Sequence, residues 1–270
     1  MPFAETRHGG LHFEVIDHVA PWHKQRQTIL FHHGIGASAE IWTGWLPALI
    51  DRFRIVTWDM RGYGRSVIPP ADFNWSLQML ADDVFTVADA AGAERFHLVG
   101  ESIGGTAALA AALARPERIA SLTVSNGAHV GGSVQGVEAW RRQLDKGGVK
   151  NWSDNFMRGR FHDAALSARR WAWFAAQQEK WTRDSILNAL GVLVGTDLTL
   201  RLKDLTAPTL LLHPDGSPFI PVPIAAELHR LLPDARLRVF EHARHGLPFS
   251  HAESCAAALR SFLESWSPDR

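Results

Sequence analysis

The stretch Gly100-Glu101-Ser102-Ile103-Gly104 has the form G-x-S-x-G, and the rest of the chain is best understood outward from it. It follows an apolar run at residues 96–99, which predicts a short buried strand, and precedes an alanine-rich run at 105–114, which predicts a helix. A strand, a tight turn and a helix place the serine in a sharp bend with its hydroxyl clear of neighbouring side chains. The flanking glycines let the strand and the helix approach closely. Ser102 is therefore a candidate nucleophile.

The overall composition is that of an ordinary globular protein. The chain has 270 residues, 46% hydrophobic and 21% charged, and 28 Lys and Arg balance 28 Asp and Glu. Balanced charge gives no basic field for nucleic acid, and no apolar run approaches the ~20 residues of a spanning helix. The N-terminal residues show no signal-peptide pattern, and a single cysteine, Cys255, excludes an internal disulfide. We expect a cytoplasmic protein without a membrane partner, either a monomer or a homodimer.

Strand-like and helix-like segments alternate over the first 126 residues. Alternation at 11–17 predicts a half-exposed strand, an amphipathic pattern predicts a helix at 76–91, and a second helix is expected at 41–50. Apolar runs typical of strands buried on both faces lie at 28–31, 54–58, 96–99 and 119–124. This alternation predicts an α/β fold with a mostly parallel central sheet flanked by helices.

Three polar or glycine-rich turns directly follow strands of the predicted sheet. They lie at residues 33–36, 59–66 and 100–104. In open parallel sheets, ligands bind beyond the carboxyl ends of the strands. We therefore expect these turns to meet at one edge of the sheet and to form the functional site.

Residues 127–203 break the pattern, since they predict helices without a convincing strand. We predict that they form a helical cap, inserted into a core domain made of residues 1–126 and 204–270. The expected cap helices lie at 137–146, 149–157, 164–181 and 185–194. The core pattern resumes with strands at 208–213 and 236–240 and helices at 222–232 and 252–266.

The cap holds five of the eleven tryptophans, and 12 Lys and Arg against 7 Asp and Glu. Most of these tryptophans are expected to pack within the cap. Trp140 and Trp171 are predicted to line a substrate site together with Gly34. The excess positive charge weakly favours an anionic substrate.

His245 is the candidate base for Ser102, because a serine hydroxyl needs a base within hydrogen-bond reach and that base needs an orienting acid. It lies between the last predicted strand and the last predicted helix, at the same edge of the sheet. His242 is the alternative base. Asp215 follows a predicted strand and is the candidate acid, with Glu241 as the alternative. The chain order Ser, Asp, His is the one that accompanies G-x-S-x-G.

The backbone N–H groups of Ile35 and Ile103 are the candidate oxyanion donors, since both lie in turns at the same edge and Ile103 opens a helix. No Cys/His cluster or H-E-x-x-H helix indicates a metal. The turn at 33–36 lacks the acidic residue that completes a dinucleotide fingerprint. We expect no metal, no cofactor and a small-molecule substrate.

Together these motifs resemble those of the α/β-hydrolase superfamily over nearly the whole chain. The resemblance rests on four stretches: His33-Gly34-Ile35-Gly36, residues 59–66, residues 100–105 and His245-Gly246. It implies a nucleophile at Ser102, a base at His245, oxyanion donors at Ile35 and Ile103, and a helical cap after the sixth strand. Within the superfamily the chain is similar to small esterases, to enol-lactonases and to hydrolases of carbon–carbon bonds.

One position departs from the family pattern, in which the acid stands four residues before a proline. Pro221 puts Ser217 there, and Asp215 stands two residues earlier.

The expected activity is that of a cofactor-independent serine hydrolase cleaving a small carboxylic ester or lactone through an acyl-enzyme. The alternatives are a carbon–carbon hydrolase of a 1,3-diketone or ring-fission product, and a ligand-binding receptor with weak turnover. A dehalogenase or epoxide hydrolase is disfavoured, because these carry aspartate where Ser102 stands.

Overall fold

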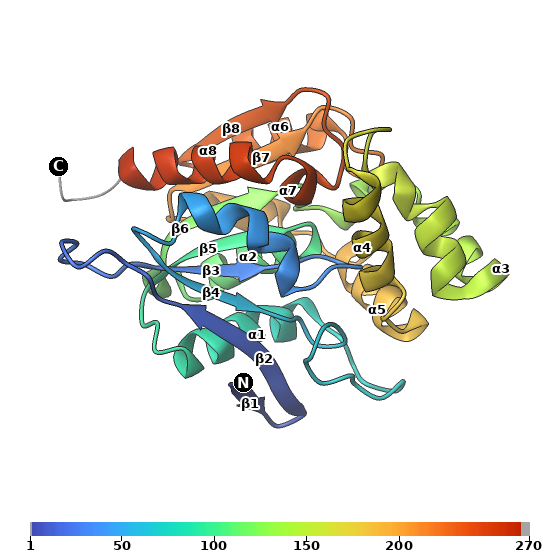
Figure 1. The fold of residues 1–270 in the computed structure, drawn as a ribbon, viewed down its shortest axis with the longest axis horizontal. Helices are drawn as coiled ribbons and strands as arrows, with labels where there is room; N and C mark the ends of the chain where they lie inside the picture. Colours follow the sequence, from blue (N-terminus) through green and yellow to red (C-terminus); the bar gives the residue numbers. More distant parts are fainter. Residues whose placement is uncertain (1, 266–270) are drawn as a thin grey trace.

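The computed structural model describes residues 2–265 and is organised around an eight-stranded sheet (Figure 1). The strands lie in the order β1-β2-β4-β3-β5-β6-β7-β8. Their bounds are β1 Phe3–Thr6, β2 Gly9–Ile16, β3 Thr28–His32, β4 Arg54–Trp58, β5 Phe96–Glu101, β6 Ile119–Ser125, β7 Thr209–Pro214 and β8 Ala235–Phe240. β2 pairs antiparallel with β1 and β4, and the neighbours from β4 to β8 are all parallel. The predicted fold class is confirmed.

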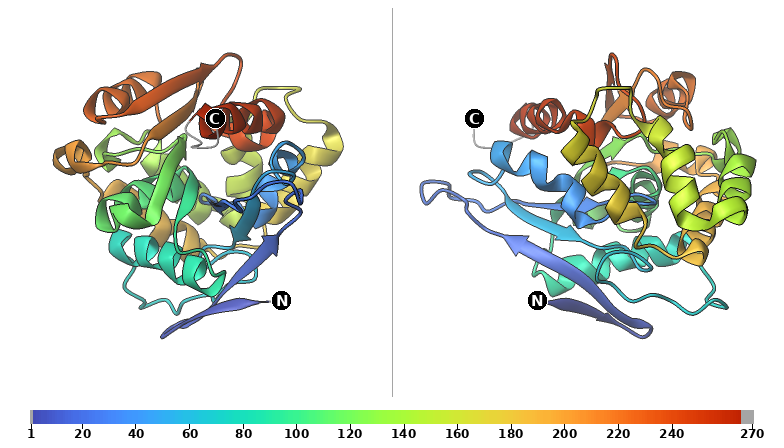
Figure 2. Two further views of the ribbon diagram at one scale, coloured as in Figure 1. Left: turned by 90° about the vertical axis from the view of Figure 1, so that its left-hand side faces the viewer. Right: turned by 45° about the vertical axis from the view of Figure 1, so that its right-hand side comes forward.

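Helices cover both faces of the sheet (Figure 2). Those of the core are α1 Leu77–Ala90, α2 Ile103–Ala114, α6 Val222–Leu231, α7 Leu247–Ser250 and α8 Ala252–Ser265, with 3-10 helices η1 Ala39–Ala48 and η2 Pro116–Arg118. Successive residues of β3 point to opposite faces: Leu30 joins the apolar cluster of α1 and α2, and Phe31 joins that of η1 and α8. Burial on both faces explains the continuous apolar run in this strand.

Most predicted core elements have the expected type, and the differences have local causes. The segment predicted as a helix at 41–50 is a 3-10 helix with Pro47 inside it, where proline removes a backbone donor. The sequence analysis does not predict β1, because this four-residue strand is defined by its pairing with β2 and carries no clear pattern of its own. The helix predicted at 252–266 is α8, and Trp266 lies outside the described residues.

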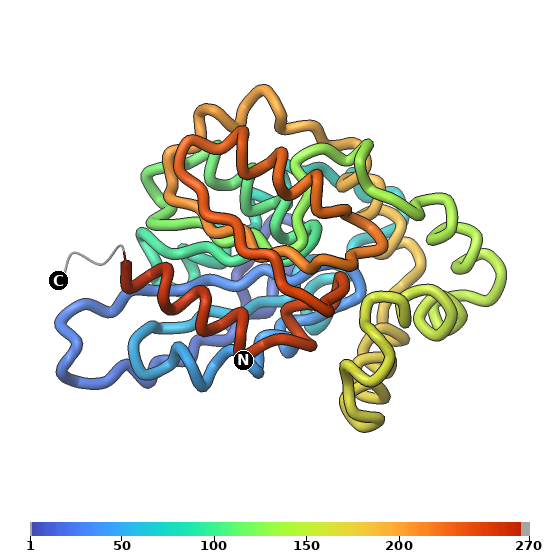
Figure 3. Tube along the Cα trace, turned by 90° about the horizontal axis from the view of Figure 1, so that it is seen from above, coloured from blue at the N-terminus to red at the C-terminus, as the bar shows by residue number. Residues whose placement is uncertain are grey.

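The chain between β6 and β7 is helical, and we refer to residues 127–203 as the cap segment. It contains η3 Gly131–Ser133, α3 Val137–Asn155, η4 Met157–Arg160, α4 Ala168–Gln178 and α5 Arg183–Val194, and η5 Thr199–Asp204 spans its end. The cap segment lies beyond the end of the sheet to which the parallel strands point (Figures 1 and 3). The two helices predicted at 137–146 and 149–157 are one kinked element, α3, because Gly147 and Gly148 have non-helical backbone angles. Within residues 2–265, no helix has the length and apolar character needed to cross a membrane.

Candidate active site

Ser102 occupies a strained turn between β5 and α2, as the sequence predicts. Its backbone angles are φ 55° and ψ −121°, a conformation that a residue with a side chain rarely adopts. The surrounding glycines are required by close contact: a Cβ on Gly104 would lie 2.5 Å from the carbonyl oxygen of His32. A Cβ on Gly100 would collide with the Gly104 carbonyl. The turn therefore holds the serine in place through backbone packing.

His245 faces this serine. Its Nε2 lies 3.2 Å from Ser102 Oγ, and the two residues are 3% and 6% exposed. The loop that carries the imidazole is held by Asn126, whose Nδ2 donates to the His245 carbonyl at 2.7 Å. Burial, followed by the charges of Arg160 and His213, holds the pKa of His245 well below 6.5. The ring is therefore neutral at pH 7 and able to accept a proton. His242, the alternative base, is exposed.

Asp215 does not contact His245, and the structure corrects the prediction that it orients this ring. Its exposed carboxylate accepts hydrogen bonds from the backbone N–H groups of His242 (2.9 Å) and Ala243 (3.1 Å). Asp215 thus shapes the loop that carries the base. Glu241, the alternative acid, is also exposed.

The position opposite His245 Nδ1 belongs to Ser217, whose Oγ lies 3.1 Å away. The same Oγ accepts from the backbone N–H groups of Phe219 (3.3 Å) and Ile220 (3.1 Å), which fix its position. The sequence signal for this arrangement was the spacing of Ser217 from Pro221. A neutral hydroxyl therefore stands where the family pattern has a carboxylate.

The turn at 33–36 lies directly against the serine. A Cβ on Gly34 would be 2.8 Å from Ser102 Cβ. The peptide that carries the Ile35 N–H is held at its carbonyl end, because His33 Nδ1 lies 2.8 Å from the Gly34 oxygen. His33 Nε2 in turn accepts from the Met60 N–H at 2.9 Å, which leaves Nδ1 as the donor. Residues 59–66 therefore support the turn at 33–36, which we call the oxyanion turn after its candidate donor Ile35. Ile103 is the first residue of α2, so its N–H has no acceptor within the helix.

A buried ion pair that the sequence analysis did not identify lies beside the serine. Arg160, from η4 of the cap segment, places Nη2 2.7 Å from Glu101 Oε1, and the two side chains are 3% and 1% exposed. Glu101 Oε1 is also 4.0 Å from His245 Nε2. The available signal was the acidic residue inside G-E-S-I-G, since a charge buried after a strand requires a partner.

The predicted substrate-lining tryptophans lie at different places. Trp140 is buried, with its ring centroid 5.5 Å from that of Phe219, and the Phe219 ring is 4.9 Å from the His245 ring. Trp171 is half-buried, and its ring centroid lies 6.1 Å from that of Phe161. A single ring, that of Phe219, thus lies between Trp140 and His245.

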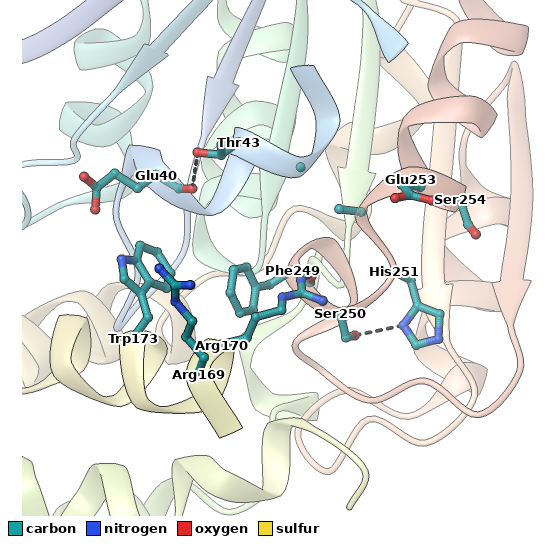
Figure 4. Close-up of a pocket in the computed structure, with 12 residues that line it drawn as sticks. Glu40, Thr43, Arg169, Arg170, Trp173, Phe249, Ser250, His251, Glu253 and Ser254 are labelled. Carbon is teal, nitrogen blue, oxygen red and sulfur yellow. Dashed lines mark hydrogen bonds between the residues drawn. The ribbon is translucent and has the colours of Figure 1, made fainter. Parts of the chain in front are cut away.

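Outside this cluster, a groove of about 880 Å³ lies between η1, α4 and the start of α8 (Figure 4). Arg169, Arg170, Trp173 and Phe249 lie along it, but none of the residues around Ser102 does. The groove is therefore separate from the cluster around Ser102, which is buried. Among residues 2–265, no three His, Cys, Asp or Glu side chains are arranged to hold a metal ion.

Residues 27–252 match the family model described as "alpha/beta hydrolase fold". The chain belongs to the α/β-hydrolase family. It is a hydrolase of this class, and the sequence-based resemblance is confirmed.

Several named proteins are similar to this α/β-hydrolase in sequence or in structure. It is 30% identical over 274 residues to the protein named "Putative carbamate hydrolase RutD" of Caulobacter vibrioides (strain NA1000 / CB15N), covering 94% of this chain and 96% of that one. In structure it resembles a hydrolase from Pseudomonas aeruginosa PA01, with a TM-score of 0.85, 23% identity and 96% of each chain covered. It also resembles the enol-lactonase from Burkholderia xenovorans LB400, with a TM-score of 0.85, 20% identity, and 97% and 100% coverage. These two structural similarities establish the fold.

Proposed function

We propose that the protein is a serine hydrolase that cleaves a small carboxylic ester or lactone through an acyl-enzyme on Ser102. The observation that carries this proposal is the 3.2 Å approach of His245 Nε2 to Ser102 Oγ in a strained turn. A nucleophile within reach of a neutral base, beside two candidate oxyanion donors, meets the requirements for acyl transfer.

The proposed reaction begins when Ser102 Oγ attacks the substrate carbonyl carbon and His245 Nε2 takes the serine proton. The N–H groups of Ile35 and Ile103 stabilise the tetrahedral oxyanion, and a donor of this kind contributes about 2.7–4 kcal/mol. His245 then protonates the departing alcohol oxygen, which leaves the acyl-enzyme. Water, deprotonated by the same imidazole, attacks the acyl carbon and releases the acid and the free serine.

Ser217 takes the place of the acid in this mechanism. Because Nε2 must accept the Ser102 proton, Nδ1 carries hydrogen and donates to Ser217 Oγ. The hydroxyl fixes the tautomer and the ring orientation, but it adds no negative charge to stabilise the imidazolium. We therefore assign Ser102 and His245 to the chemistry and Ser217 to the orientation of the base.

A carbamate is the second candidate substrate, and the names of the relatives favour it. The same Ser102 attack on a carbamate carbonyl forms a carbamoyl-enzyme and releases an alcohol. The aromatic surroundings of the base, Trp140 and Phe219, suit a small substrate with an apolar part.

The test compares hydrolysis of p-nitrophenyl acetate, a γ-lactone and a p-nitrophenyl carbamate by the wild type and by Ser102→Ala. We expect turnover of at least one substrate and a loss of about 10⁴-fold or more in the variant, since nucleophile and base act as one unit. The preferred substrate decides between ester, lactone and carbamate. Turnover that survives in S102A would exclude Ser102 as the nucleophile.

A further inference from the structure

Arg160 contacts all three loops of the candidate active site, although it belongs to the cap segment. Its Nη2 donates to Glu101, the residue before the nucleophile, at 2.7 Å. Its Nη1 donates to the carbonyl oxygen of Ile35, in the oxyanion turn, at 3.0 Å. Its own carbonyl accepts from the N–H of Gly246, next to the base, at 2.8 Å.

The chemistry of the guanidinium suits this bridging position. Its planar fork presents N–H groups in fixed directions, so one side chain can hold two acceptors at a set separation. A lysine, with one flexible ammonium, would not hold both in that way. Stability alone is a weak reason for the pair, because a buried ion pair is often no more stabilising than apolar residues of similar volume.

We propose that Arg160 is a positioning residue that holds the oxyanion turn and the nucleophile turn in register, with Glu101 as its anchor. This inference rests on the proposed function for its catalytic consequence. Arg160 holds the carbonyl of the peptide that follows Ile35. It thereby limits rotation of the neighbouring peptide, which carries the Ile35 N–H.

Arg160 also acts on the charge of the base, which supplies a second readout. The groups facing His245 are Ser102 and Glu101 at Nε2, Ser217 at Nδ1, and Arg160 and His213 as further charged or titratable neighbours. After burial, the positive charge of Arg160 is the next cause that lowers the pKa of His245. Removing that charge raises this pKa, so the fall of kcat/KM on the acid side begins at a higher pH.

The experiment compares Arg160→Met and Arg160→Lys with Arg118→Met. Arg118 is a partly buried arginine, paired with Asp89 at 2.6 Å, and it directly precedes β6, at the end of that strand opposite to Asn126. We expect kcat to fall about 100-fold in R160M and about tenfold in R160K, with a smaller change in KM, because misplacement by about 1 Å costs that much. The acid limb should move to higher pH in R160M but not in R160K. R118M should lose stability and keep kcat and the acid limb.

Hydrogen exchange gives a measurement that does not depend on turnover. The amides of residues 34–36 should exchange faster in R160M and R160K than in the wild type, and at the wild-type rate in R118M. Equal protection in all four proteins, or equal kcat in R160M and R118M, would overturn the positioning role. If the wild type hydrolysed none of the substrates, or if S102A hydrolysed them equally well, the proposed function would be refuted instead. Hydrogen exchange would still decide the role of Arg160.

Discussion

At the scale of single residues, burial lowers the pKa of His245, and the Ser217 hydroxyl beside its Nδ1 adds no negative charge that would raise it. The imidazole is buried and faces a neutral oxygen at Nδ1, and its pKa lies well below 6.5. A base of this kind stays deprotonated in mild acid. We therefore expect the acid limb of kcat/KM to lie below pH 6.5 in the wild type.

Replacing the hydroxyl by a carboxylate tests this reasoning. Ser217→Asp places a negative charge at Nδ1, which favours the imidazolium and raises the pKa of His245. The acid limb should move to higher pH, and kcat should rise by about tenfold for each 1.4 kcal/mol of added transition-state stabilisation. Ser217→Ala is the matched control, because it removes the hydrogen bond without adding charge and should lower kcat. An acid limb at the same pH in all three proteins would show that Ser217 does not act on His245.

At the scale of elements, two helical glycines have opposite packing. Gly104, in the first turn of α2, would bring a Cβ to 2.5 Å from the His32 carbonyl oxygen, whereas Gly191, in α5, is exposed with nothing within 4 Å. We expect Gly104→Ala to lower the free energy of unfolding by about 3 kcal/mol and to impair activity. Gly191→Ala should raise it by up to about 1 kcal/mol through helix propensity. Urea unfolding measures both, and changes of the same sign would contradict the packing argument.

At the scale of the whole molecule, buried neutral histidines make stability depend on pH. Burial lowers the pKa of His32 to about 3 and that of His97 to about 4. Below pH 6.5 these histidines bind protons in the unfolded chain but stay unprotonated in the folded protein, so the free energy of unfolding falls as the pH falls. The expected loss is about 2 kcal/mol for each histidine between pH 7.5 and 5.

Urea titrations at several pH values measure this loss, and His97→Asn serves as the comparison. The variant lacks one of the two groups, so its stability should depend less steeply on pH than that of the wild type. The His97 ring forms hydrogen bonds with the side chains of Ser121 and Gln27, and it precedes Ser102 by most of the length of β5, which keeps the comparison separate from catalysis. A urea midpoint independent of pH in the wild type would show that these rings are not buried in neutral form.

The sequence by itself determined the fold class and the strand–turn–helix around Ser102. Both follow from local signals: continuous apolar runs for strands buried on both faces, and glycines wherever backbones approach within contact distance. The spacing of Ser217 from Pro221 is also visible in the sequence, but the residue type favours Asp215, because a carboxylate is the usual partner of a catalytic imidazole.

Only the tertiary structure decided what the side chains contact. Asp215 and Ser217 are two residues apart in the sequence. The orientation of each side chain depends on its contacts with the loop at 240–246, which lies more than 20 residues later in the chain. Arg160 and Glu101 are separated by 59 residues, so their pairing carries no local signal. Short-range periodicity specifies helices and strands, whereas a hydrogen bond between distant loops depends on how the packed elements place them. For that reason the sequence identified the candidate nucleophile, and the folded chain identified the groups that contact its neighbours.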